Sequence, residues 1–184
     1  YFPHHDIAIM PDTPRHDHYA LQVLKLLPFG GTVLEIGGGY GGFALQVLRR
    51  SVDTRVVLCD IPETLYLAWY WLSHATPKRK IAWSDEDHGA DVVLLPERDL
   101  EQWRSPVDLV LAAHSLCEMT VDAAQRYLAW LHPRGVRYFY HESPQFTEAR
   151  PGWPPHVLTD LHCINLVPPG YKELWRAPVF WYGA

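Results

Sequence analysis

The sequence has few cysteines and no cysteine motif. Cys59, Cys117 and Cys163 are the only three in 184 residues, and no two of them have the CxxC spacing of redox or zinc sites. An odd number of widely spaced cysteines argues against a disulfide framework. We interpret them as free thiols in a reducing compartment and expect a cytoplasmic protein. No secretory signal pattern is recognisable after Tyr1, the first residue of the sequence.

Clusters of positive charge and long apolar runs are scarce as well. The longest run of Lys and Arg is 78–80, and the formal net charge is −5 with histidine neutral. This balance argues against a basic surface that binds phosphate backbones, so we expect no nucleic-acid partner. Charged residues interrupt every apolar run well short of the roughly 20 residues that span a membrane, so we expect no membrane segment. The composition is typical of one globular domain, which we assign to 1–184.

Continuous apolar runs separate segments that have a helical period. Strands are predicted at 32–36, 55–59, 91–95, 107–113 and 136–140, and 81–83 is compatible with a further short strand. Helices are predicted at 16–27, 43–50, 62–72 and 121–131. Apolar strands that alternate with helices indicate an α/β fold, a doubly wound parallel sheet of Rossmann-like type. We expect 1–15 to be an irregular arm before a core at 16–184, and 171–176 and 179–182 to form a closing antiparallel pair.

A glycine-rich loop follows the first predicted strand, and an acid ends the next one. Glycines allow a tight turn and a close approach of the backbone to a ligand. The helix that follows offers unpaired N–H groups at its start. Asp60 lies about twenty residues beyond the loop, where a carboxylate can accept hydrogen bonds from ribose hydroxyls. This order of elements predicts a site for a nucleoside-containing cofactor.

The spacing of the glycines fits two cofactors. Gly37, Gly39 and Gly42 match the GxGxxG pattern of dinucleotide-binding proteins, whereas Glu35, Gly37, Gly39 and Gly41 match the ExGxGxG pattern of S-adenosylmethionine enzymes. An acid before the loop would repel a pyrophosphate but suits the ammonium group of a methionine. We therefore predict S-adenosylmethionine as the cofactor. A loop that binds no ligand is the less favoured interpretation, and a P-loop is excluded because no Gly-Lys-Ser/Thr follows.

Three segments of the chain resemble the class I S-adenosylmethionine-dependent methyltransferases, and among these the sugar O-methyltransferase family. They are 33–42 with the glycine loop, 58–65 with the sequence LCDIPETL, and 107–119, which begins VDLV and ends HSLCEM. The first segment is specific to the superfamily. The second and third are the ones that are similar to the sugar group.

This resemblance implies a sheet of about seven strands, mostly parallel, with an antiparallel C-terminal strand. It also implies which residues bind the cofactor. The methionine and ribose portions would be held by Glu35, Gly37, Gly38, Gly39, Tyr40 and Gly41. Asp60 would take the ribose hydroxyls, Ile61 would pack on the adenine, and the segment 97–99 would approach the adenine amino group.

Methyl transfer to a hydroxyl requires alignment of the reacting atoms and a group that removes a proton. His114 and Glu118 follow the fourth predicted central strand, and His141 and Glu142 follow the fifth, so we expect all four to face one crevice. His114 is the first candidate for the base because an imidazole titrates near neutral pH, and His141 is the second. Glu118 would orient the loop or a substrate hydroxyl. A simpler alternative is that these residues only shape the rim of the pocket. A divalent ion bound by Glu118, His141 and Glu142 is a less favoured alternative.

The histidine-rich segments 4–6 and 16–18 lack the i, i+4 spacing of helical zinc sites, so we predict no metal. The arm could instead fold over the active site and bring His16 or His18 to the acceptor. Trp153, between two prolines, is a candidate for stacking on a sugar ring.

Together these residues predict an S-adenosylmethionine-dependent methyltransferase that acts on an oxygen of a sugar or a glycosylated small molecule. Two alternatives stay open from the sequence. One is an NAD-dependent oxidoreductase, which the GxGxxG spacing allows. The other is a module that binds S-adenosylmethionine without catalysis.

Overall fold

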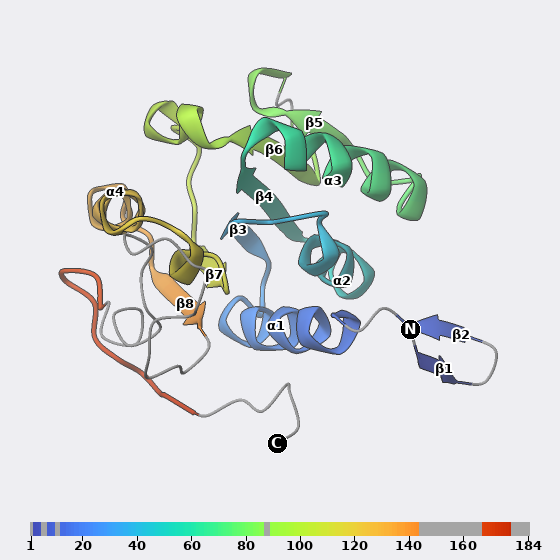
Figure 1. Cartoon of the computed structure of the whole chain (residues 1–184), viewed down its shortest axis with the longest axis horizontal. Helices are drawn as coiled ribbons and strands as arrows, with labels where there is room; N and C mark the ends of the chain where they lie inside the picture. Colours follow the sequence, from blue (N-terminus) through green and yellow to red (C-terminus); the bar gives the residue numbers. More distant parts are fainter. Residues whose placement is uncertain (1, 5–6, 10–11, 87–88, 144–166, 178–184) are drawn as a thin grey trace.

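The computed structural model of the chain is an α/β structure built on a six-stranded parallel sheet (Figure 1). It describes residues 2–4, 7–9, 12–86, 89–143 and 167–177. The strands are β1 (Phe2–His4), β2 (Ile7–Ile9), β3 (Gly31–Ile36), β4 (Thr54–Asp60), β5 (Ile81–Trp83), β6 (Val92–Pro96), β7 (Leu109–Ala113) and β8 (Tyr138–Glu142). The helices are α1 (Thr13–Leu26), α2 (Gly42–Arg50), α3 (Pro62–Ala75) and α4 (Val121–Leu131), with short 3₁₀ turns η1 (Ser84–Glu86), η2 (Glu97–Gln102), η3 (Leu116–Glu118) and η4 (His132–Arg134).

The strand order of the main sheet is β5-β6-β4-β3-β7-β8, and every pair is parallel. From β3 the chain adds β4, β5 and β6 on one side of β3. It then crosses over and adds β7 and β8 on the other side of β3. This reversal of strand order lies between β3 and β7. Ligands bind in such sheets at the carboxyl ends of the strands beside the reversal. The loops that follow β3 and β7 are therefore the places to search for a site.

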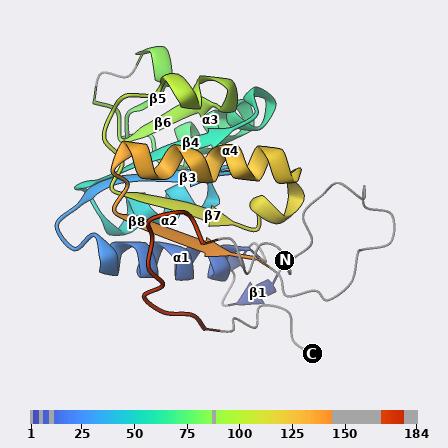
Figure 2. The same ribbon diagram turned by 90° about the vertical axis from the view of Figure 1, so that its left-hand side faces the viewer.

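Helices cover both faces of the sheet, and the two faces have separate cores. α1, α2 and α3 pack on one face, and α4 with η2 packs on the other (Figures 1 and 2). Alternate residues of β3 divide between the cores: Leu34 and Ile36 join the α4 side, whereas Val33 joins the α1 side. Because side chains alternate along a strand, Glu35 is on the α1 side with Val33.

Local sequence accounts for where the site-bearing helices begin. Gly41 precedes α2 with a left-handed φ of 84°, which lets the chain leave the loop and turn at once into the helix. Pro62 occupies the first turn of α3, where its missing N–H costs nothing. Thr120 caps α4, since its side chain accepts a hydrogen bond of 3.2 Å from the backbone N–H of Ala123.

The predicted order of strands and helices is confirmed, including the short strand at 81–83. Two details were wrong. The segment 1–15 is not simply irregular, because β1 and β2 pair as an antiparallel hairpin and α1 already begins at Thr13. Pro14 is compatible with this early start because proline is tolerated in the first helical turn.

The seventh, antiparallel strand is the other difference, since the described residues form six parallel strands in the main sheet. The segment 171–176 contains no strand, and 179–182 lies outside the described residues. Tyr171 attaches this segment to the sheet through its side chain, because its hydroxyl donates a hydrogen bond of 2.6 Å to the carbonyl of Val136. Its aromatic residues therefore reflect side-chain anchoring and not a ladder of backbone hydrogen bonds.

Two further expectations concern cysteines and the membrane. Cys59 is a buried free thiol, as predicted, Cys117 is buried as well, and Cys163 lies outside the described residues. Within the ranges that the structure describes, no helix has the length and apolar character needed to cross a membrane.

Candidate functional site

The loop between β3 and α2 turns through left-handed glycines at the carboxyl edge of the sheet. Gly37, Gly39 and Gly41 have φ values of 75°, 54° and 84°. A Cβ added to Gly37 would lie 2.5 Å from Cβ of Ser115, and one added to Gly41 would lie 2.8 Å from Cδ1 of Leu72, so both glycines are packed against protein. A Cβ added to Gly39 would meet nothing within 4 Å. Gly39 is thus the point of the loop that is open to a ligand.

Asp60 is fixed beside this open point by two backbone hydrogen bonds. Its Oδ2 accepts from the N–H of Gly39 at 2.9 Å, and its Oδ1 accepts from the N–H of Ile61 at 2.7 Å. Each carboxylate oxygen has a further lone pair, so the group can still accept hydroxyl donors. Ile61 is 44% exposed and offers an apolar surface next to it. The structure therefore brings together Gly39, Asp60 and Ile61, as the sequence predicted, while their roles toward a ligand stay predictions.

Glu35 is the most unusual group of the site. Its side chain is buried, and Oε2 has no hydrogen-bond partner. Burial, and to a smaller extent the charge of Asp60, raises the pKa of Glu35 well above its usual value. A buried acceptor without a donor costs about 1–3 kcal/mol. This oxygen can therefore accept a hydrogen bond from a donor outside the described residues.

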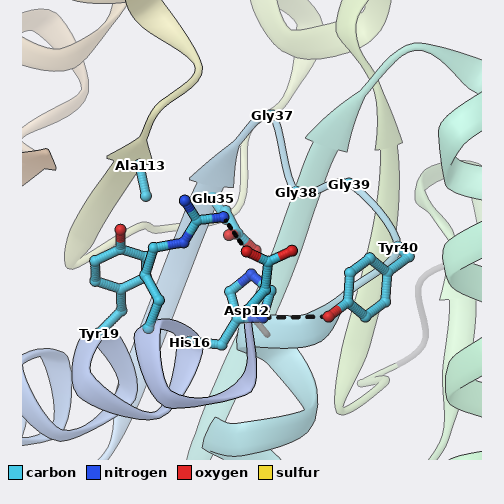
Figure 3. Close-up of a pocket in the computed structure, with 10 residues that line it drawn as sticks. Asp12, His16, Tyr19, Glu35, Gly37, Gly38, Gly39, Tyr40 and Ala113 are labelled. Carbon is cyan, nitrogen blue, oxygen red and sulfur yellow. Dashed lines mark hydrogen bonds and ion pairs between the residues drawn. The ribbon is translucent and has the colours of Figure 1, made fainter. Parts of the chain in front are cut away.

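A cavity of about 180 Å³ lies next to Glu35, between the start of α1 and the glycine loop (Figure 3). One wall comes from the first turns of α1 and the other from the loop and the end of β7. Its lining residues are Asp12, Arg15, His16, Tyr19, Glu35, Gly37, Gly38, Gly39, Tyr40 and Ala113. The sequence analysis had not placed Asp12, Arg15 or Tyr19 at the site, because no local motif signals which helix residues will contact a loop more than twenty positions away.

His16 lies against the glycine loop. Its Nδ1 is 3.4 Å from the hydroxyl of Tyr40, and the two rings meet edge to face with centroids 5.6 Å apart. Burial first, and the neighbouring charge of Arg15 next, lower the pKa of His16 to about 4, with Asp12 opposing them. The imidazole is therefore neutral at neutral pH. The segment reaches the site as part of α1, and contact of His16 or His18 with an acceptor stays a prediction.

A second cluster joins three elements on the same side of the sheet. Glu142, at the end of β8, accepts a hydrogen bond of 2.7 Å from the hydroxyl of Tyr19 on α1. The Nε2 atom of His114, which follows β7, is 3.3 Å from the same Oε1 of Glu142. Burial, and then the hydrogen bond to Glu142, raises the pKa of Tyr19, so Tyr19 is a donor in this contact.

The backbone of His114 is in an uncommon conformation. Its φ of 59° is the single positive value at a non-glycine position among the described residues. The backbone N–H of His114 donates to the carbonyl of Glu142 at 2.8 Å, which holds the residue in place. Left-handed conformations at non-glycine residues cost energy and occur often at functional sites. His114 was the first candidate for the base on its position after the strand, and the structure adds Glu142 as its partner.

The expectation that all four candidates after β7 and β8 face one crevice was wrong for His141. Its ring stacks on that of Phe139, with centroids 5.5 Å apart, on the opposite face of the sheet from Glu142. Neighbouring residues of a strand point to opposite faces, which is the reason. Burial, and then Arg176, lowers the pKa of His141. Glu118 is exposed on η3.

Other expected features are also placed by the structure. In the described part of the chain, no group of three His, Cys, Asp or Glu side chains is arranged to hold a metal ion, so the set Glu118, His141 and Glu142 is not assembled. The segment 97–99 begins η2, directly after Pro96, which pairs with Asp60 across the sheet. Its approach to an adenine stays a prediction. Trp153 lies outside the described residues.

Comparisons with known proteins identify the fold. No protein-family model matches the chain. No curated protein matches it either. Among solved structures, the mitomycin 7-O-methyltransferase MmcR has a TM-score of 0.55 at 19% identity, over 75% of this chain and 38% of that one. An O-methyltransferase family protein from Burkholderia thailandensis has a TM-score of 0.51 at 20% identity, over 67% and 34%.

A third structure is CalS10 with bound S-adenosylmethionine, an amino pentose methyltransferase from Micromonospora echinaspora. Its TM-score is 0.51 at 17% identity, over 73% of this chain and 52% of that chain. The chain therefore spans from about a third to about half of the length of these three proteins. At such identities the likeness establishes the fold: the chain has the Rossmann-like fold of the S-adenosylmethionine-dependent methyltransferases.

Proposed function

We propose that the chain is an S-adenosylmethionine-dependent methyltransferase that methylates an oxygen atom of a sugar-containing small molecule. The observation that carries the cofactor assignment is the buried Oε2 of Glu35, which has no partner and lies beside a cavity under the glycine loop. When bound, S-adenosylmethionine supplies a methyl group on a sulfonium, which is open to attack by an oxygen. Glu35 would accept hydrogen bonds from the ammonium group of its methionine end, and the same carboxylate would repel the pyrophosphate of a dinucleotide.

The remaining residues of the loop fit a nucleoside. Gly39 leaves open space where a side chain would otherwise stand. Asp60 is held next to it by backbone N–H groups and would accept hydrogen bonds from the ribose hydroxyls. The exposed side chain of Ile61 would pack on the adenine. These roles agree with those that the resemblance of the motif implies, and they need no rearrangement of the carboxylate of Asp60.

We assign the role of general base to His114. A carboxylate at 3.3 Å from Nε2 favours the tautomer with the proton on that nitrogen, which leaves Nδ1 to accept a proton from the acceptor hydroxyl. The charge of Glu142 would then stabilise the imidazolium, in the manner of carboxylate–histidine pairs in other enzymes. Tyr19 holds Glu142 from the other side. His141, on the other face of the sheet, is not part of this arrangement.

The acceptor class rests on weaker observations than the cofactor. The segments 58–65 and 107–119 are similar to those of the sugar O-methyltransferase family. Of the proteins that share the fold, one is named as acting on an amino pentose and one as a 7-O-methyltransferase of mitomycin. Both names describe methylation of small molecules. A panel of free sugars, glycosylated natural products and aglycones, assayed with radiolabelled S-adenosylmethionine, tests the sugar requirement, and transfer to aglycones alone would contradict it.

Calorimetric titration tests the cofactor assignment. We expect S-adenosylhomocysteine to bind and NAD to give no heat of binding. Glu35→Gln should weaken S-adenosylhomocysteine binding by about 10- to 100-fold, because a hydrogen bond to a charged group is worth about 1.5–3 kcal/mol. Glu86→Gln, an exposed acid on η1, is the matched control and should bind as the wild type does. Binding of NAD without binding of S-adenosylhomocysteine would overturn the proposal in favour of an oxidoreductase.

A second experiment separates an enzyme from a module that only binds the cofactor. His114→Gln should keep the affinity for S-adenosylhomocysteine and lower the rate of methyl transfer by about 10²- to 10⁴-fold, the usual contribution of a general base. Binding without transfer to any acceptor in the panel by the wild type would instead favour the non-catalytic module.

A further inference from the structure

The cavity beside the glycine loop contains side chains of opposite charge from two different elements. Arg15 reaches it from α1, and Glu35 reaches it from β3. Among the described ion pairs there is none between these two groups, and Oε2 of Glu35 has no partner at all. One wall of the cavity therefore holds a buried acceptor without a donor, and the facing wall holds a guanidinium with several N–H donors.

A ligand group that carries both an ammonium and a carboxylate would interact with both walls at once. The free end of an amino acid is such a group. We propose that Arg15 binds the carboxylate of the cofactor's methionine end while Glu35 binds its ammonium group, so that α1 is a part of the cofactor site. This assignment rests on the proposed function, which concerns Glu35 and the loop but gives no role to Arg15.

Arg15 is held at the cavity by its own helix. Its Nη2 donates to Oδ1 of Asp12 at 2.8 Å, and the side chain is 18% exposed, whereas that of Asp12 is 43% exposed. The more exposed partner thus lies toward solvent and the guanidinium lies inward. A guanidinium has five N–H donors in a planar fork, which matches the two oxygens of a carboxylate.

The charge of Arg15 acts across the cavity walls. Burial lowers the pKa of His16, and Arg15 is the second cause of the same shift. Burial raises the pKa of Tyr40, and so do Asp12 and Glu35, while Arg15 opposes them. Tyr40 therefore lies within the field of both the positive and the negative group, as a side chain that flanks a bound zwitterion should.

The size of the cavity agrees with one end of a cofactor. Its volume of about 180 Å³ is below the roughly 300–1,000 Å³ of pockets that enclose a whole small ligand. The remainder of the molecule would lie outside, over the open face of Gly39 and toward Asp60. The amino-acid end is the part that carries both charges.

Packing fixes α1 against the loop, so the position of Arg15 does not depend on the ligand. Asp17 on α1 forms an ion pair with Arg50 on α2. The ring of His16 is so close to the start of α2 that a Cβ on Gly42 would collide with its Nδ1. A guanidinium held in advance at its binding distance loses little freedom when the carboxylate arrives.

Binding of two ligands by matched variants tests the proposal. Calorimetry would give the Kd of S-adenosylhomocysteine and of its decarboxylated analogue, which keeps the ammonium group, for the wild type, Arg15→Gln and Arg15→Lys. Arg15→Gln should weaken S-adenosylhomocysteine by about 10- to 100-fold and leave the decarboxylated analogue unchanged. Arg15→Lys should lie between. Lys25→Gln removes the same charge from the exposed last turn of α1 and should change neither Kd.

The ratio of the two Kd values is read within one protein preparation, so partial misfolding of a variant does not affect it. Equal weakening of both ligands, or no weakening of either, would overturn the role of Arg15 and leave the proposed function in place. Failure of the wild-type chain to bind S-adenosylhomocysteine would overturn the proposed function and this inference together.

Discussion

Gly39→Ala offers a direct test of where the ligand approaches the loop. The residue has a φ of 54°, and an added Cβ would touch nothing within 4 Å. The substitution therefore costs only the left-handed strain of an L-residue, about 1–2 kcal/mol. For a domain of this size the melting temperature should fall by roughly 2–4 °C per kcal/mol. In the open space above Gly39, however, the new methyl group would stand where we place the ribose and sulfur. We expect S-adenosylhomocysteine binding to weaken by at least about tenfold, a loss of roughly 1.4 kcal/mol.

Alanine variants of two other glycines separate the effect of backbone strain from the effect of contact with the ligand. Gly89 has a φ of 73° and also no neighbour for an added Cβ, but it lies away from the loop, so Gly89→Ala should lower the melting temperature as much and leave binding unchanged. Gly41→Ala adds a contact of 2.8 Å with Leu72 to the same strain and should destabilise the fold more than either. The assays are thermal unfolding and calorimetric titration of the three variants. If Gly39→Ala binds S-adenosylhomocysteine as the wild type does, the ligand does not pass over this residue, and our assignment of the loop is wrong.

Three further outcomes are expected. Tyr19→Phe removes a donor from a partly buried carboxylate, so chemical denaturation should show a loss of about 1–3 kcal/mol. Methyl transfer should slow while the Kd of S-adenosylhomocysteine stays the same; an unchanged rate would exclude a role for the contact of Tyr19 with Glu142. Thr120→Ala removes the cap of α4 and should cost about 1 kcal/mol in the free energy of unfolding, whereas Thr120→Ser should not. Burial raises the pKa of Glu35 above its usual 4.5, so the stability that its protonated form contributes is present below that value and lost as pH rises through the raised pKa. Without ligand, the melting temperature of Glu35→Gln should therefore exceed that of the wild type more at alkaline than at acidic pH, and a constant difference would show that Glu35 does not titrate abnormally.

The order of elements was predictable because the central strands of the parallel sheet are buried on both faces. Such a strand is a continuous apolar run, and 55–59 or 91–95 can be recognised without any tertiary information. The wrong prediction of a strand at 171–176 also comes from reading apolar residues as a sign of a strand. The apolar residues of this segment signal contact with the sheet, but side chains provide that contact: the hydroxyl of Tyr171 bonds to Val136, and the rings of Tyr171 and Trp175 pack on Phe139 and Tyr140. The pattern of apolar residues indicates burial, but it does not distinguish a strand that pairs through its backbone from a segment that packs through its side chains.

Some residues of the candidate site could be predicted from the sequence, whereas others depend on tertiary packing. Glu35, the glycines and Asp60 lie at fixed offsets around one strand–loop–helix unit, so sequence spacing alone brings them together. Tyr19 and Glu142 are 123 positions apart, and their contact depends on how α1 docks on the sheet. Alternation along β8 could have separated His141 from Glu142 in advance, because adjacent strand residues point to opposite faces. For Arg15 no local pattern existed.

Two groups that cost stability lie beside an open glycine at one edge of the sheet. The unpartnered oxygen of Glu35, the left-handed backbone of His114 and the open Gly39 follow or end β3 and β7, on either side of the point where strand order reverses. The oxygen of Glu35 or the backbone of His114 could be tolerated as a local defect of roughly 1 to 3 kcal/mol, whereas Gly39 adopts its positive φ without strain. A ligand at a hundred times its Kd stabilises the native state by about 2.7 kcal/mol, which offsets a defect of that size. The same ligand would contact Glu35 and Gly39, and its methyl group would face the acceptor near His114. One binding event would therefore satisfy the unpartnered oxygen of Glu35 at the edge where the left-handed His114 and the open Gly39 also lie.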